Sequence, residues 1–186
     1  MAILTKGLVR PNAEQLFGKD LISQAYEQKK ITSGAELIKE YSINDFPVDV
    51  VQFAERLGIL IEYEYLDNDI SGMLSQKDGK YVITVEKRHP INRQRFTIAH
   101  ELAHYFLHKN LKEKFEDSIF FRGAESDTFE FQANLFAGEL LMPSEEFLNQ
   151  IKNGNSQIEG LAKYFGVSTL AIRVRAKQLD LQGHGL

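Results

Sequence analysis

Two histidines and a glutamate lie within about one helical turn of each other in the run His100-Glu-Leu-Ala-His104. Residues four apart lie on the same face of a helix, so the two imidazoles can bind one metal ion. Glu101 lies about 100° around the helix from His100, beside such an ion without having to bind it. Its carboxylate can take a proton from a water that the metal activates. The spacing therefore predicts a zinc hydrolase centre with His100 and His104 as ligands.

The alternative is a surface helix whose histidines are solvated. The neighbouring residues argue against it, because most positions around the motif are apolar: Phe96, Ile98, Ala99, Leu102, Ala103, Phe106 and Leu107. The helix is therefore predicted to be largely buried, and two unpaired histidines in a protein core are costly. A shared metal ion removes that cost, so we favour the metal interpretation.

A catalytic zinc site usually has three protein ligands and one open position for water. His108 lies a further turn along the helix, about 6 Å beyond His104 at a rise of about 1.5 Å per residue. Three histidines at this spacing cannot converge on one ion from a straight helix. We therefore interpret His108 as a helix-end residue near the negative pole of the helix dipole.

A second predicted helix, over residues 128–141, offers carboxylates for the missing ligand. Glu130 shares a helix face with Ala133 and Ala137, and such small residues suit the close approach of another helix. An acidic side chain on a closely packed face needs a partner, so Glu130 is predicted as the third ligand. Asn134 lies one turn later and can support a ligand by hydrogen bonding to it.

The same helical wheel places Gln132 and Glu139 on the opposite face, where a carboxylate can simply be solvated. For Glu130 the alternative is a carboxylate in the first helical turn that only complements the helix dipole. That role alone would not explain which face Glu130 occupies.

The elements that must position these residues follow one another simply along the chain. Residues 13–45 have a polar helical pattern, and a helix is predicted from Pro47 to Leu57, ended by Gly58. Three strands are predicted next, over 59–65, 70–75 and 81–86, with Asp78-Gly79 as a hairpin signal. Five more helices are predicted. The two long ones cover 93–108, after a cap at Asn92, and 128–141, after the capping spacing Asp127-x-x-Glu130. Of the other three, one is capped by Ser144, one begins at the capping spacing Ser156-x-x-Glu159, and the last covers 169–179. Strands followed by helices predict an α+β fold with segregated layers.

The composition of the 186-residue chain excludes several classes of protein. Its 43% hydrophobic and 26% charged residues are ordinary for a globular protein. Twenty-two Lys and Arg against 26 Asp and Glu leave a net charge of −4, which argues against nucleic-acid binding through a general basic surface. The sequence has no cysteine, which excludes disulfides and thiolate metal sites. No run approaches the roughly 18 apolar residues of a membrane span, so we expect a soluble, cytoplasmic protein.

Two blocks of sequence carry a pattern more specific than the zinc motif alone. The first is Arg95-Phe-Thr-Ile-Ala-His-Glu-Leu-Ala-His104, and the second runs from Glu130 through Ala133-Asn134 to Leu140-Leu-Met-Pro143. Together they resemble the ImmA/IrrE family of metallopeptidases, and the likeness covers residues 46–180. The resemblance implies a zincin-like core with a small three-stranded sheet, an HExxH active-site helix and a helical C-terminal part.

The resemblance also implies roles for these residues. His100, His104 and Glu130 would bind one Zn²⁺, with another divalent metal as the alternative, and Glu101 would be the general base. The implied substrate is a protein, often a helix-turn-helix repressor whose cleavage has a regulatory outcome. The expected organisation is a helical extension of unassigned role over 1–45, a metallopeptidase core over 46–143 and a helical segment resembling helix-turn-helix over 144–186.

Two alternatives of other classes remain open. The run from Leu161 to Arg173, with the turn Gly166-Val-Ser168, also suits a helix-turn-helix of a DNA-binding regulator. However, the would-be recognition helix begins with apolar residues, and only Arg173 and Arg175 could follow it into a groove. We therefore favour two packed helices that support the core. The other alternative is a non-proteolytic binding or toxin-like module on the same fold.

The strand predicted over 70–75 is a candidate sheet edge on which an extended peptide substrate could pair, with Gly72 permitting its close approach. The alternative is an ordinary hairpin strand.

Overall fold

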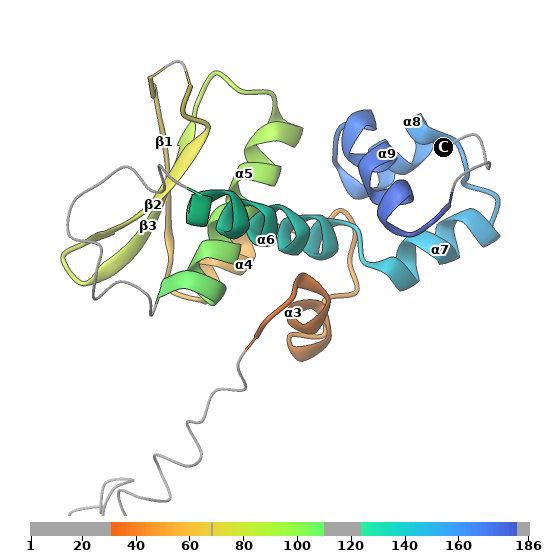
Figure 1. Cartoon of the computed structure of the whole chain (residues 1–186), viewed down its shortest axis with the longest axis horizontal. Helices are drawn as coiled ribbons and strands as arrows, with labels where there is room; N and C mark the ends of the chain where they lie inside the picture. The colour runs from red at the N-terminus through yellow and green to blue at the C-terminus, as the bar shows by residue number, and fades with distance from the viewer. Residues whose placement is uncertain (1–30, 68, 110–123, 182–186) are drawn as a thin grey trace, which may run out of the picture. The chain divides into compact units, whose positions relative to one another are not determined.

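The computed structural model divides the chain into the units Met1–Lys30 and Ile31–Leu186 and describes residues 31–67, 69–109 and 124–181 of the second. The part of the polar helical pattern over 13–30 lies outside the described residues. Within them, a three-stranded sheet precedes two long helices and three shorter ones, which confirms the predicted α+β class and its small sheet (Figure 1).

The sheet consists of β1 (Leu60–Glu64), β2 (Gly72–Lys77) and β3 (Lys80–Glu86) in the order β1-β3-β2. The central strand β3 pairs with β1 in parallel and with β2 antiparallel. Residues Val82 to Glu86 are all buried, as expected for a central strand. Asp78 and Gly79 join β2 to β3 with φ values of 50° and 76°, so the predicted hairpin is confirmed.

Two long helices form the middle of the fold. Helix α5 (Ile91–His108) packs on β2 and β3, and α6 (Ala124–Leu141) crosses α5 and packs against it (Figure 1). Helix α6 begins four residues before the predicted start, so Asp127 lies inside it and is not its cap. Helix α5 begins directly after Pro90, and the predicted cap Asn92 instead donates a hydrogen bond to the Val167 carbonyl at 3.0 Å.

The two described helices before the sheet are short. Helix α4 (Val50–Arg56) begins later than predicted, because the Asp49 side chain caps it by accepting from the Gln52 amide at 3.0 Å. Its predicted end is confirmed at Gly58, which has a φ of 75°. Helix α3 (Gly34–Glu40) packs on α6. A side chain at Gly34 would overlap backbone atoms of Phe136 and Leu140, so the two helices touch backbone to backbone.

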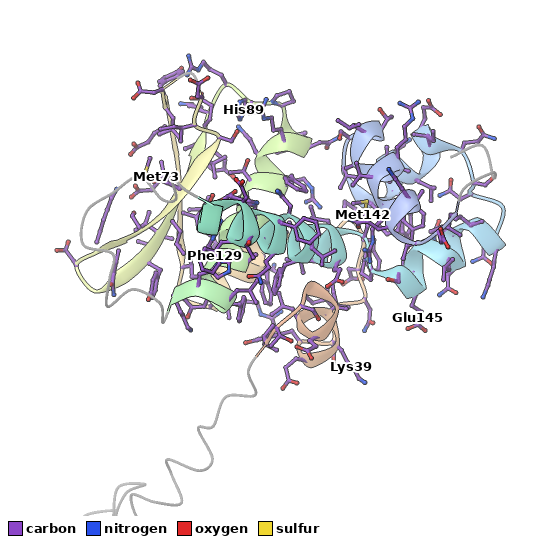
Figure 2. The ribbon with its side chains drawn as sticks, in the orientation of Figure 1. Lys39, Met73, His89, Phe129, Met142 and Glu145 are labelled. Atoms are coloured by element: carbon purple, nitrogen blue, oxygen red, sulfur yellow. The ribbon has the colours of Figure 1, made fainter. Side chains whose placement is uncertain are left out.

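Three helices follow α6: α7 (Ser144–Lys152), α8 (Ile158–Phe165) and α9 (Thr169–Gln178). Met142, labelled in Figure 2, lies where the chain passes from α6 to α7. Helix α9 is capped by Ser168, whose hydroxyl accepts from the Ala171 amide at 3.1 Å. The predicted caps of the other two helices are wrong: Ser144 is the first residue of α7, and α8 begins after Gln157 with no side-chain cap.

The core joins these elements through large buried side chains: Leu37, Ile59, Ile83, Ile98, Leu102, Phe136, Leu140, Phe147, Leu161 and Phe165. A polar contact adds to this packing, since Arg95 of α5 donates to the carbonyls of Gly166 at 3.0 Å and Val48 at 2.9 Å. Arg95 thereby connects α5 to the segment before α4 and to the turn between α8 and α9. None of the helices in the described part of the chain is long and apolar enough to span a membrane.

Candidate metal centre

The side chains of His100, His104 and Glu130 converge in the structure. The Nε2 atoms of the two histidines are 3.1 Å apart. Oε2 of Glu130 lies 3.2 Å from Nε2 of His100, and Oε1 of Glu130 lies 3.4 Å from Nε2 of His104. One ligand atom from each of the three residues lies within 4.8 Å of the others. The structure thus brings together the three residues that the sequence analysis selected as metal ligands.

The packing of two helices creates this arrangement. His100 and His104 are one turn apart on α5, so their rings point the same way. Ala133 and Ala137 of α6 are fully buried, and their small side chains allow α6 to lie close to α5. Glu130 lies one turn before Ala133, on the same face of α6. The packing of this face against α5 places Glu130 beside the two histidines.

The spacing of these atoms fits a small divalent metal ion. Two nitrogens bound to one tetrahedral zinc ion at about 2.0–2.1 Å lie about 3.3 Å from each other. The three separations of 3.1, 3.2 and 3.4 Å are close to that value. Two imidazoles and a carboxylate are also a donor set that zinc accepts. These residues therefore could hold such an ion with little rearrangement.

The electrostatics of the three groups match those of a metal site. The close contacts with the rings of His100 and His104, His100 first, hold the pKa of Glu130 well below its ordinary value, so its carboxylate is charged. Burial opposes a charge on His100, but Glu130, Glu101 and Asn134 together raise its pKa above the ordinary value. The charged carboxylate of Glu130 thus faces both imidazoles, at a place where a metal cation could bind.

Glu101 lies next to the ligands but on the sheet side of α5. Its side chain is buried, and burial is the main reason that its pKa is raised, against the opposing charges of His100 and His104 and a hydrogen bond with the backbone of Leu74. The neighbouring strand β2 approaches here at Gly72: a Cβ on that residue would overlap Cγ2 of Thr97. The close approach that Gly72 permits is therefore that of α5 to the sheet.

Asn134 makes the contact expected of a residue that supports a ligand. Its Oδ1 lies 3.1 Å from Nδ1 of His100, the ring nitrogen that faces away from Glu130. Because an amide oxygen can only accept, Nδ1 of His100 donates this hydrogen bond. In a neutral ring this leaves Nε2 with its lone pair.

Two further residues of the site were missed in the sequence analysis. His108 does lie in the last turn of α5, but its Nδ1 is 2.9 Å from Nδ1 of His104. Gln132 was predicted to turn away from the site, yet its Oε1 lies 3.1 Å from Nε2 of His108. The signal for His108 was its four-residue spacing from His104, which repeats the spacing of the ligand pair.

This chain is similar to a peptidase family, to a metallopeptidase and to one solved structure of related fold. Residues 54–177 match the family model for the IrrE N-terminal-like domain, a peptidase family. Metallopeptidase ImmA of Bacillus subtilis is 33% identical over 122 residues, which cover 61% of this chain and 69% of that protein. A solved Mycobacterium tuberculosis transcriptional regulator shares the fold, with a TM-score of 0.56 at 21% identity, over 75% of this chain and 44% of that one. The chain therefore belongs to the ImmA/IrrE family of metallopeptidases.

Proposed function

We propose that this chain is a zinc-dependent endopeptidase that hydrolyses a peptide bond in a protein substrate. The observation that supports it most is the convergence of His100, His104 and Glu130 beside the buried carboxylate of Glu101. Three converging ligands with a nearby carboxylate are the arrangement that metal-assisted hydrolysis requires.

In this proposal His100, His104 and Glu130 hold one Zn²⁺. When bound, the ion would polarise the scissile carbonyl and acidify water. Glu101 takes a proton from the attacking water and later delivers it to the nitrogen of the leaving amine. Burial raises the pKa of Glu101 above its usual value, which suits a group that must both accept and release a proton. Asn134 keeps the ring of His100 in the orientation and tautomer that metal binding needs.

The sheet offers a place for an extended peptide. Among the described strands, β2 is at an edge, since it pairs only with β3. Its outer backbone groups can pair with a substrate strand beside Glu101. A helix-turn-helix repressor is the substrate that we propose, with a regulatory outcome of its cleavage. We further propose that residues 46–143 form the peptidase core, 1–45 an extension, and 144–186 a supporting helical segment.

One observation weakens the DNA-binding alternative. Of the two arginines that could follow α9 into a groove, Arg175 is buried and donates to the Met142 carbonyl and the Ser144 hydroxyl, both at 2.9 Å. Only Arg173 remains exposed. Helices α8 and α9 are thus better suited to supporting the core than to reading DNA.

The experiment that tests the proposed function combines metal analysis with cleavage assays on the full chain. The substrates are helix-turn-helix repressors encoded beside its gene, and the variants are Glu101→Gln and, as a control, the exposed Glu159→Gln. We expect one zinc per chain in all three proteins and a loss of cleavage of at least ~100-fold in Glu101→Gln alone. Equal activity of Glu101→Gln would exclude the mechanism, and loss of its zinc would make Glu101 a ligand.

A further inference from the structure

Hydrogen bonds connect the side chains of His104, His108 and Gln132, starting from the ring nitrogen of His104 that is remote from Glu130. Nδ1 of His104 is 2.9 Å from Nδ1 of His108, and Nε2 of His108 is 3.1 Å from Oε1 of Gln132. Both histidines are buried, with exposed fractions of 9% and 7%. Phe129, labelled in Figure 2, lies edge-on to the His108 ring with the ring centres 4.7 Å apart.

The direction of these hydrogen bonds determines which nitrogen of His104 carries its hydrogen. A neutral imidazole has one N–H donor and one bare nitrogen that accepts. Because Oε1 of Gln132 accepts, Nε2 of His108 carries the hydrogen and Nδ1 of His108 is bare. The hydrogen between the two rings must then belong to Nδ1 of His104. This leaves Nε2 of His104 with the lone pair that a metal ion needs.

The opposite arrangement would block the site. If Gln132 presented its NH₂ group to His108, every hydrogen bond in the chain would reverse and Nε2 of His104 would carry the hydrogen. Glu130, whose Oε1 lies 3.4 Å from that nitrogen, would stabilise this unproductive form by accepting the hydrogen. A hydrogen-bond acceptor at Nδ1 of His104 is therefore needed to favour the tautomer that can bind a metal ion.

We propose that Gln132 and His108 are positioning residues that hold His104 in its metal-binding tautomer. This inference rests on the proposed function, because it assumes that His104 is a metal ligand. Gln132 acts through His108, and His108 acts through His104. His100 has the matching support from Asn134, so each ligand histidine has a hydrogen-bond acceptor behind it.

The test measures Zn²⁺ affinity of the full chain by competition with a chelator, without any peptide substrate. Gln132→Met keeps the length of the side chain and removes the amide, and Gln132 is exposed, so the variant should fold. We expect its zinc affinity to fall ~10-fold, the lower end of the effect for partners behind a ligand. Gln52→Met, also an exposed helical position, is the control and should bind zinc as the parent does.

A double variant separates positioning from general damage. His108→Leu should lose at least as much affinity as Gln132→Met, and the double variant should lose no more than His108→Leu alone, because Gln132 acts through His108. In ¹⁵N NMR spectra of the zinc-loaded parent, we expect the ring hydrogen of His108 on Nε2. A ring hydrogen on Nδ1 of His108, additive losses, or unchanged affinity in Gln132→Met would overturn the inference and leave the proposed function standing. A parent that takes up no zinc would overturn both.

Discussion

Gly72 of β2 faces Glu101 of α5, such that a Cβ at position 72 would lie 3.8 Å from Oε1 of Glu101. The same Cβ would overlap Cγ2 of Thr97 and lie 2.8 Å from the Thr84 carbonyl oxygen. The edge strand β2 and helix α5 are thus in contact at the proposed general base, and they can be so close only because position 72 has no side chain.

Gly72→Ala should therefore destabilise the protein. The added methyl group must displace Thr97 and press on the backbone of β3, and such overpacking costs about 1–3 kcal/mol. Urea unfolding measures the loss. Gly138→Ala is the matched control, since its nearest neighbour is Oε1 of Gln178 at 3.9 Å and alanine favours a helix interior by about 0.5–1 kcal/mol. Equal stability of Gly72→Ala and the parent would mean that β2 can move away from α5.

Glu130→Gln should weaken zinc binding, because a neutral amide replaces an anionic ligand of the same size. The loss of zinc affinity should exceed the roughly 10–100-fold that is typical when a residue hydrogen-bonded to a metal ligand is replaced. Glu139→Gln on the same helix is the control and should bind zinc as the parent does, since Glu139 is not among the converging residues. Chelator competition measures both variants. A larger loss for Glu139→Gln would show that the third ligand is assigned wrongly.

Glu86 should make the stability of the fold depend on acid pH. Its carboxylate accepts from the Arg88 side chain, the Arg88 amide and the Leu66 amide, and these contacts, Arg88 first, hold its pKa well below the ordinary value. A lowered pKa means that the stabilisation is complete above the unfolded-state pKa of about 4.3 and is lost as the pH falls further. Glu86→Gln should therefore unfold at lower urea than the parent at pH 7, and the difference should shrink below about pH 4.

The exposed Glu64→Gln is the control for this pH series and should follow the parent throughout. A difference between Glu86→Gln and the parent that stays constant down to pH 2 would mean that Glu86 acts by its shape and not by its charge.

Arg175→Met should destabilise the helices that follow α6. The variant leaves the buried Met142 carbonyl without its donor at 2.9 Å, and an unpaired buried polar group costs about 1–3 kcal/mol. Arg173→Met, at an exposed position of the same helix, should change the stability by no more than about 0.5 kcal/mol. Thermal or urea unfolding distinguishes the two. Similar effects of both substitutions would contradict a structural role for Arg175.

The predictions that held depended on neighbours in sequence. Gly58 and Asp78-Gly79 act through the conformation of their own backbone, so the local pattern was sufficient. Two of the caps that failed are side chains with distant partners. Asn92 binds the Val167 carbonyl and Ser144 accepts from Arg175, and no rule for helix starts considers residues so far along the chain.

The same distinction applies to the candidate site. The positions of His100, His104 and Glu130 could be predicted because helical periodicity alone selects the face of each helix. The contact of His108 with Gln132 depends on how closely α6 approaches α5, and a single helical wheel turns Gln132 away. Only the packing of the two helices shows that its side chain reaches back to the histidines.

The backbone contact at Gly34 has a consequence for the evolution of this chain. Because any Cβ there would overlap backbone atoms of α6, which cannot move aside as a flexible side chain could, the distance between α3 and α6 and the residue at position 34 must change together. A related protein that keeps this spacing should keep glycine at the equivalent position. In a relative with a larger residue there, the helix equivalent to α3 should lie farther from the helix equivalent to α6.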